Sequence, residues 1–104
     1  MEKRPPSNLI HILDLFENVY SVTWKRMFGG FGIFHRGLMV AIVVKNILYL
    51  KSSEENRTIF EEKKLERFSY QSKGKTVYLK YYMAPEIIFD DTEEAEYWLN
   101  LAIK

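Results

Sequence analysis

The sequence contains no cysteine, which excludes disulfide bonds, thiolate nucleophiles and zinc ribbons. It also lacks long apolar segments: the longest run spans only residues 38–44, whereas a membrane-spanning helix needs about 20 such residues. Neither sign of charge predominates, because 15 Lys and Arg are balanced by 14 Asp and Glu, for a net charge of +1. Since no global field draws such a chain to nucleic acid or anionic lipid, we expect a cytoplasmic protein without membrane contact.

The sequence does contain enough apolar residues for a folded core, because 47% of its 104 residues are hydrophobic and 15% are aromatic. Disordered chains bury far less apolar surface. Two separate cores of about 50 residues each would be marginally stable, so residues 1–104 are predicted to form a single domain. Near the N-terminus His11 and Asp14 interrupt the apolar residues, and we therefore expect no signal peptide.

The first half of the chain predicts one helix followed by three strands. Apolar residues recur at spacings of three and four over about residues 8–21, which is typical of an amphipathic helix. β-Branched and aromatic residues dominate residues 22–51. This composition favours strands near 23–35, 38–44 and 47–51.

Glycine and asparagine mark the expected turns of these strands. Arg36-Gly37 and Lys45-Asn46 stand where hairpin turns join the second strand to its neighbours. Gly29, Gly30 and Gly32 lie inside the first predicted strand, and their tolerance of unusual backbone angles indicates a bend or bulge. A structural bend explains this cluster better than a phosphate-binding loop, because the glycine spacing of such loops is absent.

The second half predicts a helix, a hairpin and a last helix. Ser52 and Glu55 have capping-box spacing at the start of a helix that runs to about Lys64. Strands near 67–72 and 76–83 flank a turn whose central residue is glycine. The whole order is α-β(3)-α-β(2)-α, and tight turns between strands imply mostly antiparallel pairing. We expect an α+β fold of two layers.

The strand predicted at 38–44, Leu-Met-Val-Ala-Ile-Val-Val, is apolar at every position. In a two-layer fold one face of the sheet packs against helices and the other meets water, so polar residues normally alternate with apolar ones. A large uncovered apolar face is unusual on a monomer. We therefore expect a second copy of the chain or another protein to cover the face away from the helices. The alternative is that the first and last helices cover opposite faces.

Two further classes of function stay open. Basic and aromatic residues of the second hairpin suit a ribbon that stacks on bases and contacts the phosphates of nucleic acid: Tyr70, Lys73, Lys75, Tyr78, Lys80 and Tyr82. A pocket between sheet and helices would suit a small molecule, although few candidate catalytic groups converge. His11 and His35 lie on different predicted elements without partners at metal-ligand spacing, so we expect no metal site.

Ordered motifs give the chain a resemblance to a known family. They are Arg26-Met27-Phe28-Gly29-Gly30-Phe31-Gly32, Leu48-Tyr49-Leu50-Lys51, Glu55-Asn56-Arg57 with Phe60 one helical turn on, and Tyr81-Tyr82 before Pro85-Glu86. Over about residues 9–102 the chain resembles the N-terminal domain of the TfoX/Sxy family of bacterial competence regulators. That family usually carries a glycine and a proline near the end of the second helix, where this sequence has Lys64 and Arg67. The second, helical domain of full-length members has no counterpart, so the chain resembles the stand-alone members.

The resemblance implies a two-layer α+β fold related to the secretion-chaperone-like arrangement. It also implies a non-enzymatic role in transcriptional regulation of competence and DNA-uptake genes, where family members assist a DNA-bound activator. No catalytic residue and no cofactor come with it. The expected partner is a protein, such as a transcription activator, or a second copy of the chain. Candidate binding residues are those of the motifs: Phe28, Gly29, Gly30, Tyr49, Lys51, Asn56, Arg57, Tyr81 and Tyr82. Arg57 is expected either to form a salt bridge or to take part in recognition.

Overall fold

The computed structural model of the protein describes residues 7–27 and 29–103, and there the chain forms three α-helices and one six-stranded antiparallel sheet. The helices are α1 (Ser7–Glu17), α2 (Arg57–Glu62) and α3 (Thr92–Ile103), with a short 3-10 helix, η1 (Glu86–Phe89), before α3. The strands, in the order β1-β2-β3-β4-β6-β5, are β1 (Thr23–Met27), β2 (Gly30–His35), β3 (Leu38–Val44), β4 (Ile47–Lys51), β6 (Lys75–Met83) and β5 (Arg67–Ser72). The predicted α+β class is confirmed. No helix in this described part of the chain is long and apolar enough to cross a membrane.

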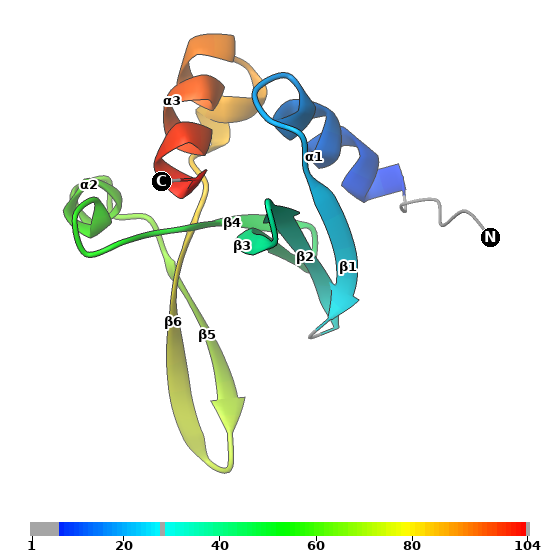
Figure 1. Ribbon diagram of the computed structural model, residues 1–104. Helices are drawn as coiled ribbons and strands as arrows, with labels where there is room; N and C mark the ends of the chain where they lie inside the picture. The colour runs from blue at the N-terminus through cyan, green and yellow to red at the C-terminus, as the bar shows by residue number, and fades with distance from the viewer. Residues whose placement is uncertain (1–6, 28, 104) are drawn as a thin grey trace.

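The helices α1 and α3 lie on the same face of the sheet (Figure 1). Their apolar stripes supply the core between the two layers: Leu9 and Phe16 of α1 and Trp98 and Leu99 of α3 are buried. Phe60 of α2 joins them, with its ring centroid 5.2 Å from that of Trp98. The apolar periodicity of the first and last helices therefore marks the side chains that face the sheet.

The segment 23–35, predicted as one bent strand, is a hairpin of two strands. β1 and β2 pair from Thr23 opposite Phe34 to Met27 opposite Gly30. Gly29 lies in the turn with a φ of +73°, a backbone conformation that favours glycine. The predicted order α-β(3)-α-β(2)-α is thus corrected to four strands before α2, because the glycine cluster reverses the chain instead of bending it.

The other three hairpin turns lie where the sequence places them. Each has two residues with positive φ: 52° and 80° at Arg36-Gly37, 52° and 65° at Lys45-Asn46, and 50° and 78° at Lys73-Gly74. Two consecutive positive φ values define the type I′ turn, whose twist matches that of the flanking strands. These turns fix the antiparallel pairing of β2 with β3, β3 with β4, and β5 with β6.

Reciprocal bonds one residue later than the predicted capping box lie in the turn that precedes α2. The backbone N–H of Ser53 donates to Asn56 Oδ1 at 2.8 Å, and the N–H of Asn56 donates to Ser53 Oγ at 3.3 Å. Ser52 is buried instead, and its hydroxyl donates to the carbonyl of Lys80 at 2.9 Å. The pair of Ser52 and Glu55 is therefore wrong as a cap, because Ser52 continues the pairing of β4 with β6.

The end of α2 is closed by a Schellman motif. The N–H of Leu65 donates to the carbonyl of Phe60 at 3.3 Å, and the N–H of Lys64 donates to the carbonyl of Glu61 at 2.9 Å. This pair of hydrogen bonds requires a residue in the left-handed conformation just after the helix. Lys64 adopts that conformation, with a φ of 58°. Lys64 therefore occupies a conformation in which glycine is favoured.

The hairpin of β5 and β6 leaves the plane of the sheet. Only the last residues of β6 pair with β4, from Lys51 opposite Tyr81 to Tyr49 opposite Met83. Just before that point the pairing of β5 with β6 is irregular. As a result the hairpin extends away from the helices on the opposite side of the sheet (Figure 1).

Candidate functional site

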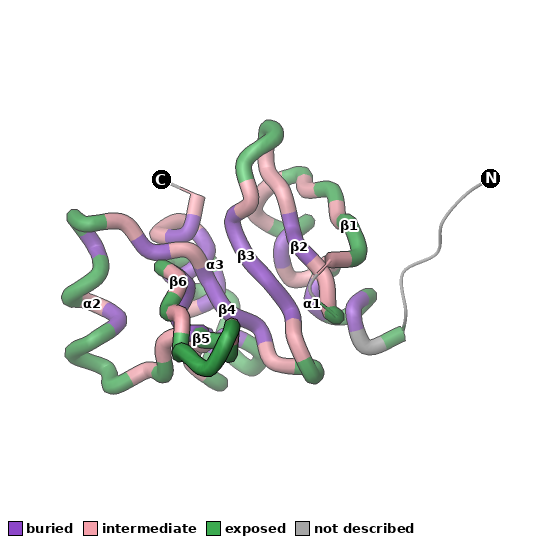
Figure 2. The backbone as a smooth tube through the Cα atoms, turned by 90° about the horizontal axis from the view of Figure 1, so that it is seen from below, coloured by how far each residue is buried: buried purple, intermediate pink, exposed green. Residues whose placement is uncertain are grey.

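The face of the sheet away from the helices carries an apolar cluster of its own. Ile42, Tyr49, Phe68 and Tyr81 are buried there, with Met39, Val44, Ile47, Leu79 and Met83 packed against them. We call this surface the far face. The remaining buried side chains of β3 pack with the helix-side core. The apolar strand β3 therefore contributes side chains to two apolar clusters, one on each face of the sheet. Figure 2 views the sheet from the side of the far face, and β3 is buried along most of its length.

Much of the far face is covered by the chain itself. Ile42 has an exposed fraction of 0%, and the hydroxyl of Tyr81 reaches across to donate to the carbonyl of Met39 at 2.8 Å. The rings of Tyr49 and Phe68 meet edge to face with centroids 5.0 Å apart. Burial raises the pKa of both Tyr49 and Tyr81 above the usual 10.0. Residues of β4, β5 and β6 therefore cover part of the face that a second copy of the chain or another protein is expected to cover.

An apolar groove remains open beside this cluster, in the angle between the hairpin and β3. It encloses about 570 Å³, and its lining residues are Val44, Lys45, Phe68, Ser69, Tyr70 and Leu79. Tyr70 keeps 46% of its surface exposed. Lys45 supplies the one charged side chain of this lining. We call this hollow the far-face groove.

A second hollow lies where β4 ends and α2 begins. It encloses about 400 Å³, and its lining residues are Lys51, Ser52, Ser53, Glu54, Arg57, Arg67 and Lys80. Four of these side chains are cationic and one is a carboxylate. They come from β4, the segment before α2, α2 itself, β5 and β6. We call it the basic hollow.

Arg67 is held in place at the edge of the basic hollow. Its Nε donates to the carbonyl of Leu79 at 2.7 Å, and its guanidinium lies 5.9 Å from the ring centroids of both Tyr78 and Tyr82. Such ring contacts favour a planar cation. The terminal nitrogens of this guanidinium are the groups left to meet a ligand.

Tyr82 links the same region to α2. Its hydroxyl donates to Glu61 Oε2 at 2.7 Å, and Glu61 also forms an ion pair with Arg57 at 3.7 Å. Burial, followed by the hydrogen bond to Glu61, raises the pKa of Tyr82 above 10.0. Arg57 therefore has the salt bridge expected of it, on an exposed helical turn where such pairs contribute little.

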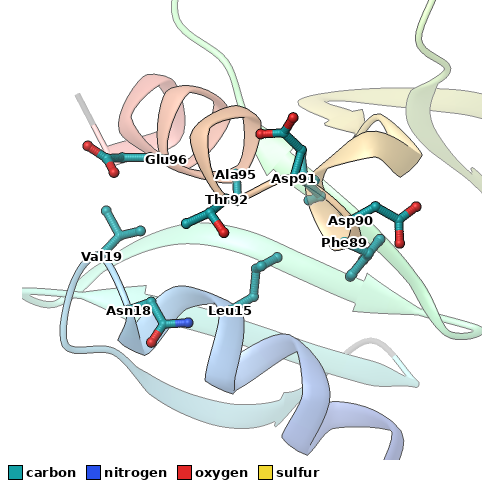
Figure 3. A pocket seen from close by; sticks show the side chains of 10 residues that line it. Leu15, Asn18, Val19, Phe89, Asp90, Asp91, Thr92, Ala95 and Glu96 are labelled. Atoms are coloured by element: carbon teal, nitrogen blue, oxygen red, sulfur yellow. The ribbon is translucent and has the colours of Figure 1, made fainter.

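A third hollow, of about 250 Å³, separates α1 from the junction of η1 and α3. Figure 3 shows Asp90, Asp91 and Glu96 around it, opposite Asn18 of the segment after α1. Asp91 caps α3, because its Oδ1 accepts the backbone N–H of Glu94 at 3.0 Å. Within residues 7–27 and 29–103, no group of three or more His, Asp or Glu side chains is placed to hold a metal ion.

The glycine motif has a structural role in the described residues, while Phe28 lies outside them. Gly29 makes the β1–β2 turn. A Cβ atom at Gly30 would overlap the backbone carbonyl oxygen of Val43 on β3. Gly30 therefore permits a close approach of two strands, and neither glycine lies in a lining described above.

The remaining predicted binding residues fall into separate places. Tyr49 and Tyr81 belong to the far face, whereas Lys51 and Arg57 line the basic hollow. The other two face the helix layer: Tyr82 packs in the main core, and Asn56 is buried, with its Nδ2 donating to the carbonyl of Leu101 at 3.0 Å. The motif residues are thus divided among the far face, the basic hollow and the helix-side core.

The basic and aromatic residues proposed as a nucleic-acid ribbon are divided between the two faces of the hairpin. Tyr78 and Tyr82 both contact Arg67 on one face. Tyr70 lies with Leu79 in the far-face groove on the other. Tyr82 is also buried. The six side chains therefore do not form one continuous surface.

Sequence reasoning missed Phe68, Leu79 and Arg67 as surface-forming residues. Phe68 and Leu79 have the alternating apolar pattern of half-buried strands, which predicts burial on one face but not which groove they line. In the sequence, Arg67 stands out only as a departure from the pattern of the family that the chain resembles. Its position opposite Tyr82, set by the strand register, is what brings it to Lys80 and Lys51.

Comparison with known families agrees with this fold. The sequence model of the TfoX N-terminal domain matches residues 14–104, a range that includes all six strands, α2 and α3. No curated protein matches the chain significantly. Because the match covers most of the sequence and all of the sheet, the chain belongs to the TfoX N-terminal domain family.

Proposed function

We propose that this protein is a non-enzymatic, cytoplasmic interaction module that assists transcriptional regulation of competence and DNA-uptake genes by binding another protein through its far-face groove. Membership of the TfoX N-terminal domain family supports the regulatory role. The single observation that carries the mode of action is the open apolar groove beside a covered apolar cluster. Aromatic side chains in such hollows are the usual anchors of protein interfaces.

The chemistry of the groove defines the partner segment. Phe68, Tyr70 and Leu79 offer an apolar floor, and Lys45 places a positive charge at its border. A segment with an apolar anchor beside an acidic residue matches both features. This charge also argues against a second copy of the chain: in a two-fold dimer the groove would face itself, and its lining contains no carboxylate to meet Lys45.

Two tyrosine variants test the groove. Tyr70→Ser removes an exposed groove tyrosine, and Tyr97→Ser removes one of nearly equal exposure, 48%, on α3. Each ring has one neighbouring ring contact in its own element, to Phe68 and Trp98 respectively. The pair is therefore matched in chemistry and differs in location.

We expect one protein from an extract of the source organism to be retained by the wild type and by Tyr97→Ser, and lost by Tyr70→Ser. With that protein purified, Tyr70→Ser should bind it about tenfold or more weakly, and transcripts of DNA-uptake genes should fall in a strain carrying Tyr70→Ser only. Equal retention by both variants contradicts the proposal. So does a wild-type dimer in sedimentation that Tyr70→Ser dissociates, because the groove would then hold a second copy.

A further inference from the structure

We propose that the basic hollow is a binding site for a compact phosphoryl polyanion, of the kind presented by inorganic pyrophosphate or a diphosphate group. Side chains alternate along β6, so Lys80 faces the basic hollow while Leu79 faces the far-face groove. The two surfaces lie on opposite sides of the hairpin. The site therefore stands independently of the protein-docking function.

The backbone brings the cations of the hollow together. Ser52 fastens the end of β4 to β6, because its N–H and its hydroxyl both donate to the carbonyl of Lys80, at 2.8 and 2.9 Å. Lys51 pairs with Tyr81, the neighbour of Lys80 on β6, and both lysines line the hollow. Arg57 follows one helical turn later, after the segment that Ser53 caps. The clustering is a consequence of the fold.

Positive charge in the hollow is only partly balanced. Arg57 pairs with Glu61 at 3.7 Å. In the described part of the chain no ion pair involves Lys51, Arg67 or Lys80, and Glu54 is the one carboxylate in the lining. Like charges gathered in one concavity repel each other and focus a positive potential. An anion with several charges relieves that repulsion.

Arg67 gives the site a fixed donor. Its Nε bond to Leu79 and its contacts with two tyrosine rings hold the guanidinium in one orientation. A fixed guanidinium offers paired N–H groups that match the geometry of phosphate oxygens. Ser53 adds a hydroxyl in the same lining. It accepts the N–H of Asn56, so its own hydrogen remains to be donated.

The arrangement of the charges favours a compact polyanion over a nucleic-acid strand. A phosphodiester backbone carries one charge per phosphate and is bound by cations spaced along it. Here four cations surround a single hollow of about 400 Å³. Several negative charges on adjacent phosphoryl groups match that concentration better than a line of single charges.

Titration with inorganic pyrophosphate, followed by amide NMR shifts and calorimetry, tests the site. Lys80→Gln removes a cation of the hollow, and Lys75→Gln removes an exposed cation of the same strand outside it. We expect shifts confined to residues around the hollow, about tenfold weaker binding in Lys80→Gln, and binding unchanged within twofold in Lys75→Gln. Arg57→Gln provides a second loss variant on a different element, and thermal unfolding shows that each variant is folded.

Two further ligands separate the sources of the phosphoryl group. Orthophosphate should bind more weakly than pyrophosphate, and a thymidine 12-mer should not displace pyrophosphate from the hollow. The proposal is overturned if pyrophosphate shifts no residue of the hollow, if Lys80→Gln and Lys75→Gln weaken binding equally, or if the oligonucleotide displaces pyrophosphate. Since none of these outcomes involves Tyr70, failure here leaves the protein-docking function untouched.

Discussion

Tyr81 and Tyr82 are neighbours in the sequence and act on opposite sides of the sheet. The hydroxyl of Tyr81 donates to the carbonyl of Met39 on the far face. That of Tyr82 donates to Glu61 on the helix side, where its ring stacks on Phe60 at 5.3 Å. Their place in the family motif marks both tyrosines as candidate binding residues but does not assign either one to a face of the sheet. Only the alternation of the strand assigns one to each apolar cluster.

Replacing Tyr81 by Phe tests the bond that spans the far face. We expect Tyr81→Phe to lower the free energy of unfolding by about 1–2 kcal/mol at pH 7, because the carbonyl of Met39 loses its side-chain donor. Urea denaturation measures this difference. An unchanged free energy would show that the hydroxyl contributes nothing to covering the far face.

The stability difference between the wild type and Tyr81→Phe should also depend on pH. Burial raises the pKa of Tyr81 above 10.0 in the folded state. Above pH 10 the unfolded state therefore releases this proton first and binds fewer protons than the folded state, so the wild type loses stability as pH rises. Tyr81→Phe lacks that loss. The stability difference between the two proteins should be constant below about pH 9 and narrow above pH 10; a widening difference contradicts the assignment.

Gly30 illustrates a residue whose conservative replacement disturbs the backbone. In Gly30→Ala the new Cβ would overlap the carbonyl oxygen of Val43, so β2 and β3 must move apart. We expect a loss of about 1–3 kcal/mol in the free energy of unfolding.

Gly29→Ala is the matched control for that change. A Cβ at Gly29 meets no atom within 4 Å, although its φ of +73° is unfavourable for alanine. Its cost should be about 1 kcal/mol, from backbone strain alone. If chemical denaturation shows Gly29→Ala to be the more destabilised protein, overlap with Val43 is not what requires glycine at position 30.

At the scale of elements, α2 is a six-residue helix fixed at both ends by bonds outside its own ladder. Reciprocal bonds of Ser53 and Asn56 close the turn just before it, and Asn56 also ties this turn to the carbonyl of Leu101 near the end of α3. Lys64 closes its other end in a left-handed conformation. So short a helix is not stable by itself, and these attachments hold the basic hollow in shape.

The left-handed residue after α2 predicts a stabilising substitution. Lys64→Gly removes the steric cost of a Cβ at a φ of 58°, and we expect a gain of about 0.5–1 kcal/mol in the free energy of unfolding. Lys63→Gly, one residue earlier at a φ of −82°, should instead lose a similar amount. Thermal and urea unfolding of the two variants compare these signs. A loss in both would show that the Schellman motif does not govern this helix end.

At the scale of the whole molecule, the three helices and three of the four hairpin turns could be predicted from the sequence because they depend on local patterns. The dipeptides at 36–37 and 45–46 carry the turn residues that their positive φ values need. The β1–β2 hairpin was not predicted, because a glycine cluster is compatible with a bend and with a full reversal. The open angle of the β5–β6 hairpin was not predicted either, since it follows from how few residues of β6 pair with β4.

The same limit applies to the candidate surfaces. Motif residues such as Tyr49, Lys51 and Arg57 could be selected from the sequence, but which surface each one lines depends on how the end of β4, α2 and β6 meet in the fold. The apolar character of β3 was predicted from the sequence, whereas the packing of β5 and β6 residues on its far face was not. Phe68 of β5 reaches it because the hairpin leaves the sheet plane, whereas Tyr81 lies in the part of β6 that pairs with β4.

Site-specific photo-crosslinking in cells of the source organism tests the docking role of the far-face groove most directly. A photoreactive phenylalanine replaces Tyr70 in one protein and Tyr97, of nearly equal exposure, in the other. We predict a discrete adduct with a different protein from position 70 and no such adduct from position 97. Adducts formed equally from both positions, or from position 70 only with a second copy of the chain, would contradict the account.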